Sequence, residues 1–210
     1  MRKKKMIRLI IAILVIIAIV LGIMKLTGNK NADIKRLSNL YEKLNTSQTY
    51  LFEWEKSEDT KTIMAKKGDK TIIDDYSENG HSTTIVKDNN TYLVLHDREE
   101  YYVYEGNTVE QNILTEGLSE VVAKEFITGT EKVKGQKYSY EEYNGSTMFM
   151  SANTLDTNEE EIKTRFYFDK NDNLVYIRTI IGVNQELLKI RLETEVDDSV
   201  FEIPANYAEN

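Results

Sequence analysis

The sequence predicts a mainly antiparallel β domain of the α+β class, preceded by one N-terminal transmembrane helix. Three observations predict it: an uninterrupted apolar run near the N-terminus, a series of short alternating segments separated by turn residues, and a Tyr-rich composition. The chain has 13 Tyr, 10% aromatic residues and a single Pro, which suits strands. Its 210 residues fit one domain plus an appendage.

The apolar run covers residues 9–24, LIIAILVIIAIVLGIM, and extends to 19 residues if Met6 and Ile7 are counted and Arg8 snorkels to the headgroups. About 20 apolar residues cross a bilayer. Residues 1–25 carry six basic and no acidic side chains, which predicts a cytoplasmic N-terminus. We therefore predict a cytoplasmic basic tip and transmembrane anchor over 1–27, a linker over 28–32 and an extracytoplasmic domain over 33–210.

A cleaved signal peptide is the alternative for the same segment. Its apolar stretch is shorter, typically ~7–15 residues, and ends in small residues. Here Lys25-Leu26-Thr27 follows the apolar run, without an Ala-x-Ala pattern, which favours an uncleaved anchor in the cell membrane. Secretion after cleavage stays open. Both readings export the rest of the chain.

Composition excludes several functions. The chain has no Cys, which rules out disulfides, thiolate metal sites, a Cys nucleophile and lipidation on a cysteine. The 185 residues after the basic tip and apolar run hold 21 of the 27 basic side chains and all 35 acidic ones, a net charge of −14. Such a domain repels a phosphate backbone, so nucleic acid is not an expected partner.

An amphipathic helix is predicted over 33–44, and a half-buried strand begins at Tyr50, where the hydrophobic period changes to two. Residues 107–128 predict one or two short helices. About ten strands are expected in all, with hairpin turns between most of them. The further strands are predicted near 60–67, 70–76, 81–87, 91–97, 100–105, 136–143, 146–152, 162–169, 173–181 and 186–195, with an extended segment at 200–204.

Three patches resemble the LolA/LppX-like lipoprotein-carrier superfamily. Residues 129–140 look like the beginning of that family's second half-sheet, 166–177 like its Phe-Asp-turn-Leu hairpin, and 196–204 like its closing Phe-x-x-Pro segment. The resemblance implies an unclosed β-barrel, helices across its concave face and an apolar cavity in which family members bind acyl chains or lipoproteins. This chain departs from the family by its predicted membrane anchor.

Aromatic and Met side chains on the predicted strands are candidates for the lining of such a cavity, because they adapt to irregular apolar ligands. Ordinary core packing is the competing interpretation for each of them. A one-residue change of register moves a whole set to the opposite face, so the sequence does not say which face points inward. The candidates are Phe52, Trp54, Met64, Tyr92, Tyr102, Tyr104, Met148, Met150, Phe166 and Phe168.

No catalytic residue, metal ligand or cofactor is predicted. His81 and His96 are the only histidines; they lack the spacing of a zinc motif and are expected at the surface or on an edge strand. Asp74-Asp75 is interpreted as a solvated acidic face. Residues 169–173 begin like a calcium loop, but Leu174 stands where the loop requires Gly, so a hairpin turn is expected.

These features favour a non-enzymatic, membrane-anchored protein of the cell envelope that binds a lipid, an acyl chain or another hydrophobic ligand in a half-barrel. The alternative is a protein-interaction or envelope-sensing module with the same fold and an envelope protein as its partner. A pocket of several hundred Å³ favours the first hypothesis; an exposed apolar patch or a free sheet edge favours the second.

Overall fold

The structure is a computed structural model that describes residues 35–107, 112–145 and 162–210. The predicted anchor over 1–27, the linker over 28–32 and the strand over 146–152, with Met148 and Met150, lie outside these residues. Within the three described ranges, no helix combines the length and the apolar composition that crossing a bilayer requires. Residues 36–210 form one compact unit.

Twelve strands, two α-helices and two short 3-10 helices make up the described part of this unit. In chain order they are α2 (Arg36–Ser47), β1 (Thr49–Ser57), β2 (Thr60–Lys67), β3 (Lys70–Ser77), β4 (Gly80–Lys87), β5 (Asn90–Leu95), η1 (His96–Arg98), β6 (Glu100–Glu105), α3 (Ile113–Val122), β7 (Phe126–Val133), β8 (Gln136–Asn144), β9 (Ile162–Phe168), β10 (Leu174–Ile181), β11 (Asn184–Glu193), η3 (Asp198–Phe201) and β12 (Ala208–Glu209).

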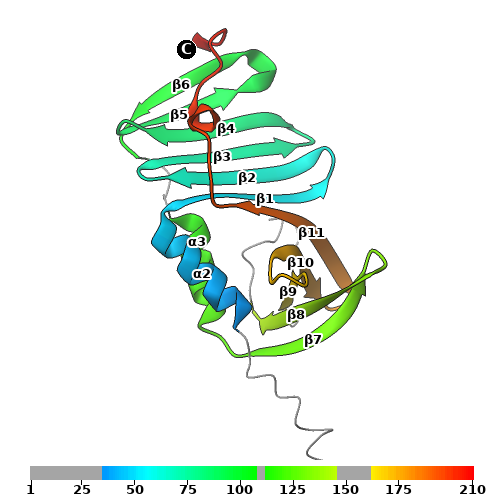
Figure 1. Cartoon of the computed structure of the whole chain (residues 1–210). Helices are drawn as coiled ribbons and strands as arrows, with labels where there is room; N and C mark the ends of the chain where they lie inside the picture. The colour runs from blue at the N-terminus through cyan, green and yellow to red at the C-terminus, as the bar shows by residue number, and fades with distance from the viewer. Residues whose placement is uncertain (1–34, 108–111, 146–161) are drawn as a thin grey trace, which may run out of the picture. The chain divides into compact units, whose positions relative to one another are not determined.

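All twelve strands belong to one unclosed, curved sheet with the order β12-β6-β5-β4-β3-β2-β1-β11-β10-β9-β8-β7 (Figure 1). Two meanders build it. The first runs from β1 outward to β6, and the second runs from β7 inward to β11, which pairs antiparallel with β1. Among these strands, the two-residue β12 pairs in parallel, with β6. The prediction of a mainly antiparallel, unclosed sheet with helices is confirmed, with twelve strands instead of about ten.

The hairpins follow from their turn residues. Asp88 and Asn89 both have positive φ, 52° and 59°, the conformation of a two-residue turn whose twist matches that of the flanking strands. Asn and Asp tolerate this region better than other non-Gly residues. Lys134 and Gly135, with φ of 48° and 85°, make the equivalent turn between β7 and β8. The turn at residues 169–173 is also confirmed, since Asp169 accepts hydrogen bonds from the backbone N–H groups of Asn171 and Asn173.

Two parts of the sequence prediction were wrong. Residues 126–128 belong to strand β7, not to a helix, because β8 supplies a full antiparallel partner along Phe126–Val133. The Thr-Gly-Thr at 128–130 obscures its alternation. Near the C-terminus, the first two residues of the extended segment predicted over 200–204 belong to η3, whereas Glu202 has extended backbone. The 3-10 turn forms because Asp197 accepts a hydrogen bond from the Ser199 N–H and caps it.

Each face of the sheet carries its own apolar core. The face against which α2 and α3 pack is called the helix face, and the opposite one the outer face. The helix-face core consists of Leu37, Leu44, Tyr50, Phe52, Leu114, Leu118, Val121, Tyr143, Phe166, Phe168, Leu174, Ile177, Leu188 and Ile190. The outer-face core consists of Leu51, Ala65, Ile72, Ile85, Val94, Val196 and Phe201. The strands of the first meander thus bury apolar side chains on both faces.

The C-terminal segment, residues 196–209, covers the outer-face core (Figure 1). Lysines at the ends of the strands fasten it: Lys67 donates to the Val196 carbonyl at 3.1 Å and to Asp198 at 2.8 Å, and Lys87 donates to the Phe201 carbonyl at 2.8 Å. Hydrogen bonds from Lys67 and Lys70 hold the pKa of Asp198 below its usual value. The segment therefore serves as a lid over the outer face of the first meander.

Candidate ligand-binding site

Three of the predicted cavity residues meet in the helix-face core. Phe52 comes from β1, and Phe166 and Phe168 come from β9; all three are at most 1% exposed. Tyr50, two residues before Phe52, lies on the same face, and burial raises its pKa to about 12. The helix face around these residues is thus strongly apolar.

Trp54 and Met64 are half-buried and pack against the helix-face core. Trp54 continues the row of Tyr50 and Phe52 along β1, and its ring centroid lies 5.9 Å from that of Phe52. Met64 pairs with Phe52 across the β1–β2 ladder. Five predicted residues, from β1, β2 and β9, therefore share one face of the sheet.

The three predicted tyrosines do not belong to the helix-face core. Tyr92 packs with the outer-face core, because its position on β5 is opposite Ile85 in the β4–β5 register. On β6, Val103 pairs with Tyr92, so its neighbours Tyr102 and Tyr104 lie on the opposite face, the helix face. Tyr104 is 46% exposed there. The structure thus divides the predicted set between both faces. That any of these residues contacts a ligand stays a prediction.

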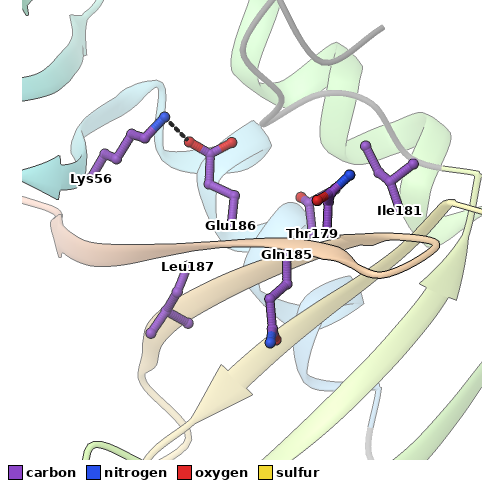
Figure 2. A pocket seen from close by; sticks show the side chains of 7 residues that line it. Lys56, Thr179, Ile181, Gln185, Glu186 and Leu187 are labelled. Atoms are coloured by element: carbon purple, nitrogen blue, oxygen red, sulfur yellow. Dashed lines mark ion pairs between the residues drawn. The ribbon is translucent and has the colours of Figure 1, made fainter. Parts of the chain in front are cut away.

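A pocket of about 410 Å³ lies where β10 ends and β11 begins, next to the end of β1 (Figure 2). Thr179 and Ile181 come from β10, and they follow Ile177 of the helix-face core at intervals of two residues. On β11, Glu186 precedes Leu188 of the same core. The pocket therefore continues the apolar helix face along its strands. Its complete lining is Lys56, Thr179, Ile181, Asn184, Gln185, Glu186 and Leu187.

One ion pair stands at the rim of this pocket. The Lys56 ammonium lies 2.8 Å from a Glu186 carboxylate oxygen, and the two side chains are 54% and 19% exposed. Figure 2 shows this pair on the same side of β11 as Thr179, whereas Gln185 and Leu187 point to the other side of the strand. Ile181, which continues the apolar row of Ile177 on β10, thus lies in a pocket with a charged rim, an arrangement that suits an amphipathic ligand.

The sequence analysis missed all seven lining residues, because it searched for aromatic and Met side chains. A usable signal was present: the hairpin with Gly182-Val183 at its tip fixes the β10–β11 register, which pairs Ile181 with Asn184 and Thr179 with Glu186. These pairs lie on the helix face because Ile177 and Leu188 do. Among the described residues, no helix covers these pairs, and they therefore line a pocket instead of a core. The pattern of a strand does not show where a helix packs, so the sequence could not reveal this difference.

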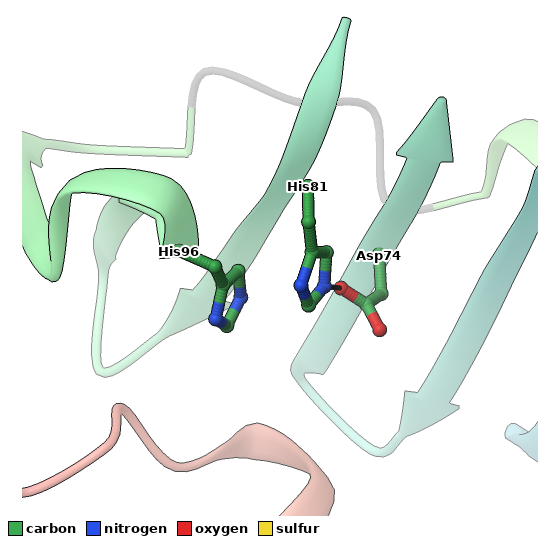
Figure 3. Close-up of side chains that lie close together, drawn as sticks. All are labelled: Asp74, His81 and His96. Atoms are coloured by element: carbon green, nitrogen blue, oxygen red, sulfur yellow. Dashed lines mark hydrogen bonds and ion pairs between the residues drawn. The ribbon is translucent and has the colours of Figure 1, made fainter. Parts of the chain in front are cut away.

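The histidines are not two separate surface residues, as the sequence predicted. His81 on β4 and His96 on η1 stack with ring centroids 3.6 Å apart and an interplanar angle of 4° (Figure 3). Asp74 on β3 lies beside them, 2.7 Å from His81. The site is half-buried on the outer face; burial, and then the charge of His81, lower the pKa of His96. The expectation that Asp74 belongs to a solvated acidic face is also wrong.

Fold and pocket together define the class: a half-barrel, one unclosed antiparallel sheet with two helices on one face and a pocket beside them. No protein-family model and no curated protein matches the chain. Among solved structures, LprF from Mycobacterium bovis is 10% identical, with 84% of this chain and 98% of that chain covered and a TM-score of 0.48.

Two further solved structures are similar. An uncharacterized conserved protein from Thermus thermophilus is 7% identical, with 83% of this chain and 96% of that chain covered and a TM-score of 0.45. The Mycobacterium tuberculosis lipoprotein LppX is 13% identical, with 79% and 98% covered and a TM-score of 0.42.

Proposed function

We propose that the chain is a membrane-anchored, extracytoplasmic protein that binds a lipid, an acyl chain or another hydrophobic ligand on the helix face of its half-barrel. One observation carries the proposal: the 410 Å³ pocket opens on the helix face and continues its apolar core. Its volume falls within the ≈ 300–1,000 Å³ that is typical of small-molecule sites.

Burial of apolar surface would supply most of the affinity, at roughly 25 cal/mol per Å² removed from water. An acyl chain entering beside Ile181 would extend toward Ile177 and Leu188, which lie further along the same strands. The Lys56–Glu186 pair would stay at the opening, where the exposed Lys56 ammonium faces the polar end of the ligand. The role proposed for the protein is binding, with no chemical step.

The N-terminal apolar run supports a tethered location. A helix over residues 9–24 would hold the half-barrel at the outer surface of its own bilayer. A tethered binding domain can take up or present lipid at that surface without diffusing between membranes. The chain would thus bind the same kind of ligand as a soluble shuttle but stay attached to its membrane.

Photo-crosslinking of the full chain in lipid nanodiscs tests the proposal. A fatty acid with a photoreactive group at the end of its acyl chain is added, and the crosslinked residues are mapped by mass spectrometry. We expect crosslinks on β10, β11 and β1, lost when excess unlabelled fatty acid is present. Crosslinks confined to residues 1–27, or unaffected by the competitor, would overturn the proposal and favour a protein-interaction module.

A further inference from the structure

Three side chains with metal-ligating atoms converge on the outer face, away from the proposed ligand pocket. They are Asp74 on β3, His81 on β4 and His96 on η1, and one ligand atom from each lies within 4.8 Å of the other two. Figure 3 shows both imidazole rings beside each other, with Asp74 next to the His81 ring. Two imidazoles and a carboxylate are the ligand set of many divalent transition-metal sites.

The cluster follows from two short hairpins. The β3–β4 register pairs Asp74 with Thr83 and Tyr76 with His81. The β4–β5 register pairs Ser82 with Leu95, so His81 and His96 come next to each other at the ends of those strands. The ligands therefore stand on a rigid part of the sheet, and the Tyr76 ring, stacked on His81 with centroids 3.8 Å apart, supports the imidazole from its far side.

The ligand atoms are close enough together for one cation, provided that the imidazole rings reorient. Ligand atoms of a tetrahedral zinc site lie about 3.3 Å from one another, given metal–ligand bonds of about 2.0–2.1 Å. His81 Nε2 and Asp74 Oδ1 are 2.7 Å apart, a hydrogen bond whose proton the metal would displace. The parallel rings must also tilt, so that their in-plane lone pairs point to a common centre.

Neighbouring hydroxyls hold two of the ligands. Thr83 Oγ1 donates to Asp74 Oδ1 at 2.5 Å, and it lies 2.7 Å from His96 Nε2, a contact that a metal on Nε2 would replace. The Tyr207 hydroxyl lies 3.0 Å from His96 Nδ1, the ring nitrogen that would remain after Nε2 has bound a metal. A metal-ligating His usually donates its second ring N–H to such a partner, which fixes its orientation. Tyr207 belongs to the C-terminal segment, so the site also joins that segment to β3 and β4.

We propose that Asp74, His81 and His96 form a binding site for a divalent cation of the zinc class, with water in the remaining position. The cation connects β3, β4 and η1 and, through Tyr207, fastens the C-terminal segment over the outer-face core. The acidic character of the exported part of the chain, −14 after residue 25, raises the local concentration of divalent cations.

Cobalt(II) and zinc(II) binding to the full chain in detergent tests the proposal, with a purification tag that contains no histidine. We expect the visible absorption of four-coordinate cobalt on addition of Co²⁺, and its loss on addition of Zn²⁺. Zinc at 100 times the dissociation constant should raise the unfolding midpoint by roughly 5–10 °C. Because the chain has two histidines, NMR should show both imidazole Hε1 signals shifting together.

The variants Asp74→Asn and His81→Gln should abolish the cobalt absorption, and Tyr207→Phe should weaken zinc binding by about 10-fold. Asp75→Asn is the matched control: the neighbouring carboxylate on β3 accepts a hydrogen bond from Thr62 and points to the opposite face, so binding should be unchanged. If the ligand variants do not fold, the cobalt and NMR measurements on the unmodified chain still test the proposal. Absence of the cobalt absorption, or a shift of only one imidazole, would overturn the proposal, as would equal binding by Asp74→Asn.

Discussion

The carboxylate of Glu141 caps helix α2 from another element. This side chain is fully buried on β8; its Oε1 accepts the Arg36 N–H at 2.6 Å and its Oε2 accepts the Leu37 N–H at 3.2 Å. Oε2 also accepts the Tyr143 hydroxyl at 2.9 Å, and burial together with the charge of Glu141 raises the pKa of Tyr143. One strand residue thereby fixes where α2 begins on the helix face.

Replacing this carboxylate should loosen α2. Glu141→Leu leaves two helix N–H groups and a buried hydroxyl without their acceptor, and we expect a loss of about 3 kcal/mol in the free energy of unfolding. Urea unfolding of the full chain measures it, and hydrogen exchange should increase first in the first turn of α2. Glu42→Gln, at an exposed carboxylate on the same helix, is the control. A loss under about 0.5 kcal/mol for Glu141→Leu would contradict the capping role.

Glu131 on β7 joins two arginines on the outer face of the second meander. It lies 2.5 Å from Arg178 and 2.8 Å from Arg165, and it accepts the Tyr167 hydroxyl at 2.8 Å. Partial burial raises the pKa of Glu131, but the hydrogen bonds from Tyr167 and Arg178 outweigh it and keep the pKa below the usual 4.5. Its charge therefore stabilises the folded state.

This shift predicts a pH-dependent stability. Because the folded pKa is depressed, the contribution of Glu131 is complete above the unfolded pKa of about 4.3 and is lost as the pH falls through the folded value. Glu131→Gln should therefore destabilise the protein at pH 7 by about 1–2 kcal/mol, and the difference from the unmodified chain should shrink below about pH 5. Denaturant unfolding from pH 7 to pH 3 measures it, with Glu58→Gln in the exposed β1–β2 turn as the control. A difference independent of pH would be inconsistent with this account.

Two residues predicted from sequence as cavity lining should differ sharply in their effect on stability. Phe166 is fully buried in the helix-face core, whereas Tyr104 is 46% exposed near the end of β6. Phe166→Ala should lower the free energy of unfolding by about 3–5 kcal/mol, and Tyr104→Ala should change it by less than about 0.5 kcal/mol. Chemical denaturation of both variants provides the comparison. Similar effects would mean that the core is not centred on Phe166.

The sequence allowed the architecture to be predicted because its turns are chemically explicit. Asp88-Asn89 and Lys67-Gly68-Asp69 mark hairpins by their dihedral preferences, and consecutive hairpins give an antiparallel meander. Strand β7 was missed because Gly129 stands at its centre, where a Cβ would approach the Tyr140 ring to 2.4 Å. Gly129 permits the close approach of the Tyr140 ring and does not mark a turn.

The site was less predictable, for two physical reasons. Which face of a strand is covered depends on register and on helix placement, so Tyr92 and Phe52 were grouped together although they lie on opposite faces. Charged residues were also expected to be solvated, so the capping role of Glu141 and the position of Asp74 beside the histidines were not predicted. The histidine pair could have been found: the two-residue turn at Asp88-Asn89 places positions 81 and 96 opposite each other when the hairpin register is continued by one residue.

Ligand binding in the pocket is tested most directly by filling it. Asn184 lines the pocket, whereas Val183, its neighbour in the chain, is 96% exposed at the hairpin tip. The measurement is the concentration of photoreactive fatty acid that gives half-maximal crosslinking of the full chain in nanodiscs. Asn184→Trp should raise this concentration at least about 10-fold, the effect of losing ~1.4 kcal/mol of binding free energy, and Val183→Trp should leave it unchanged. Equal values for the two variants and the unmodified chain would contradict binding at this site.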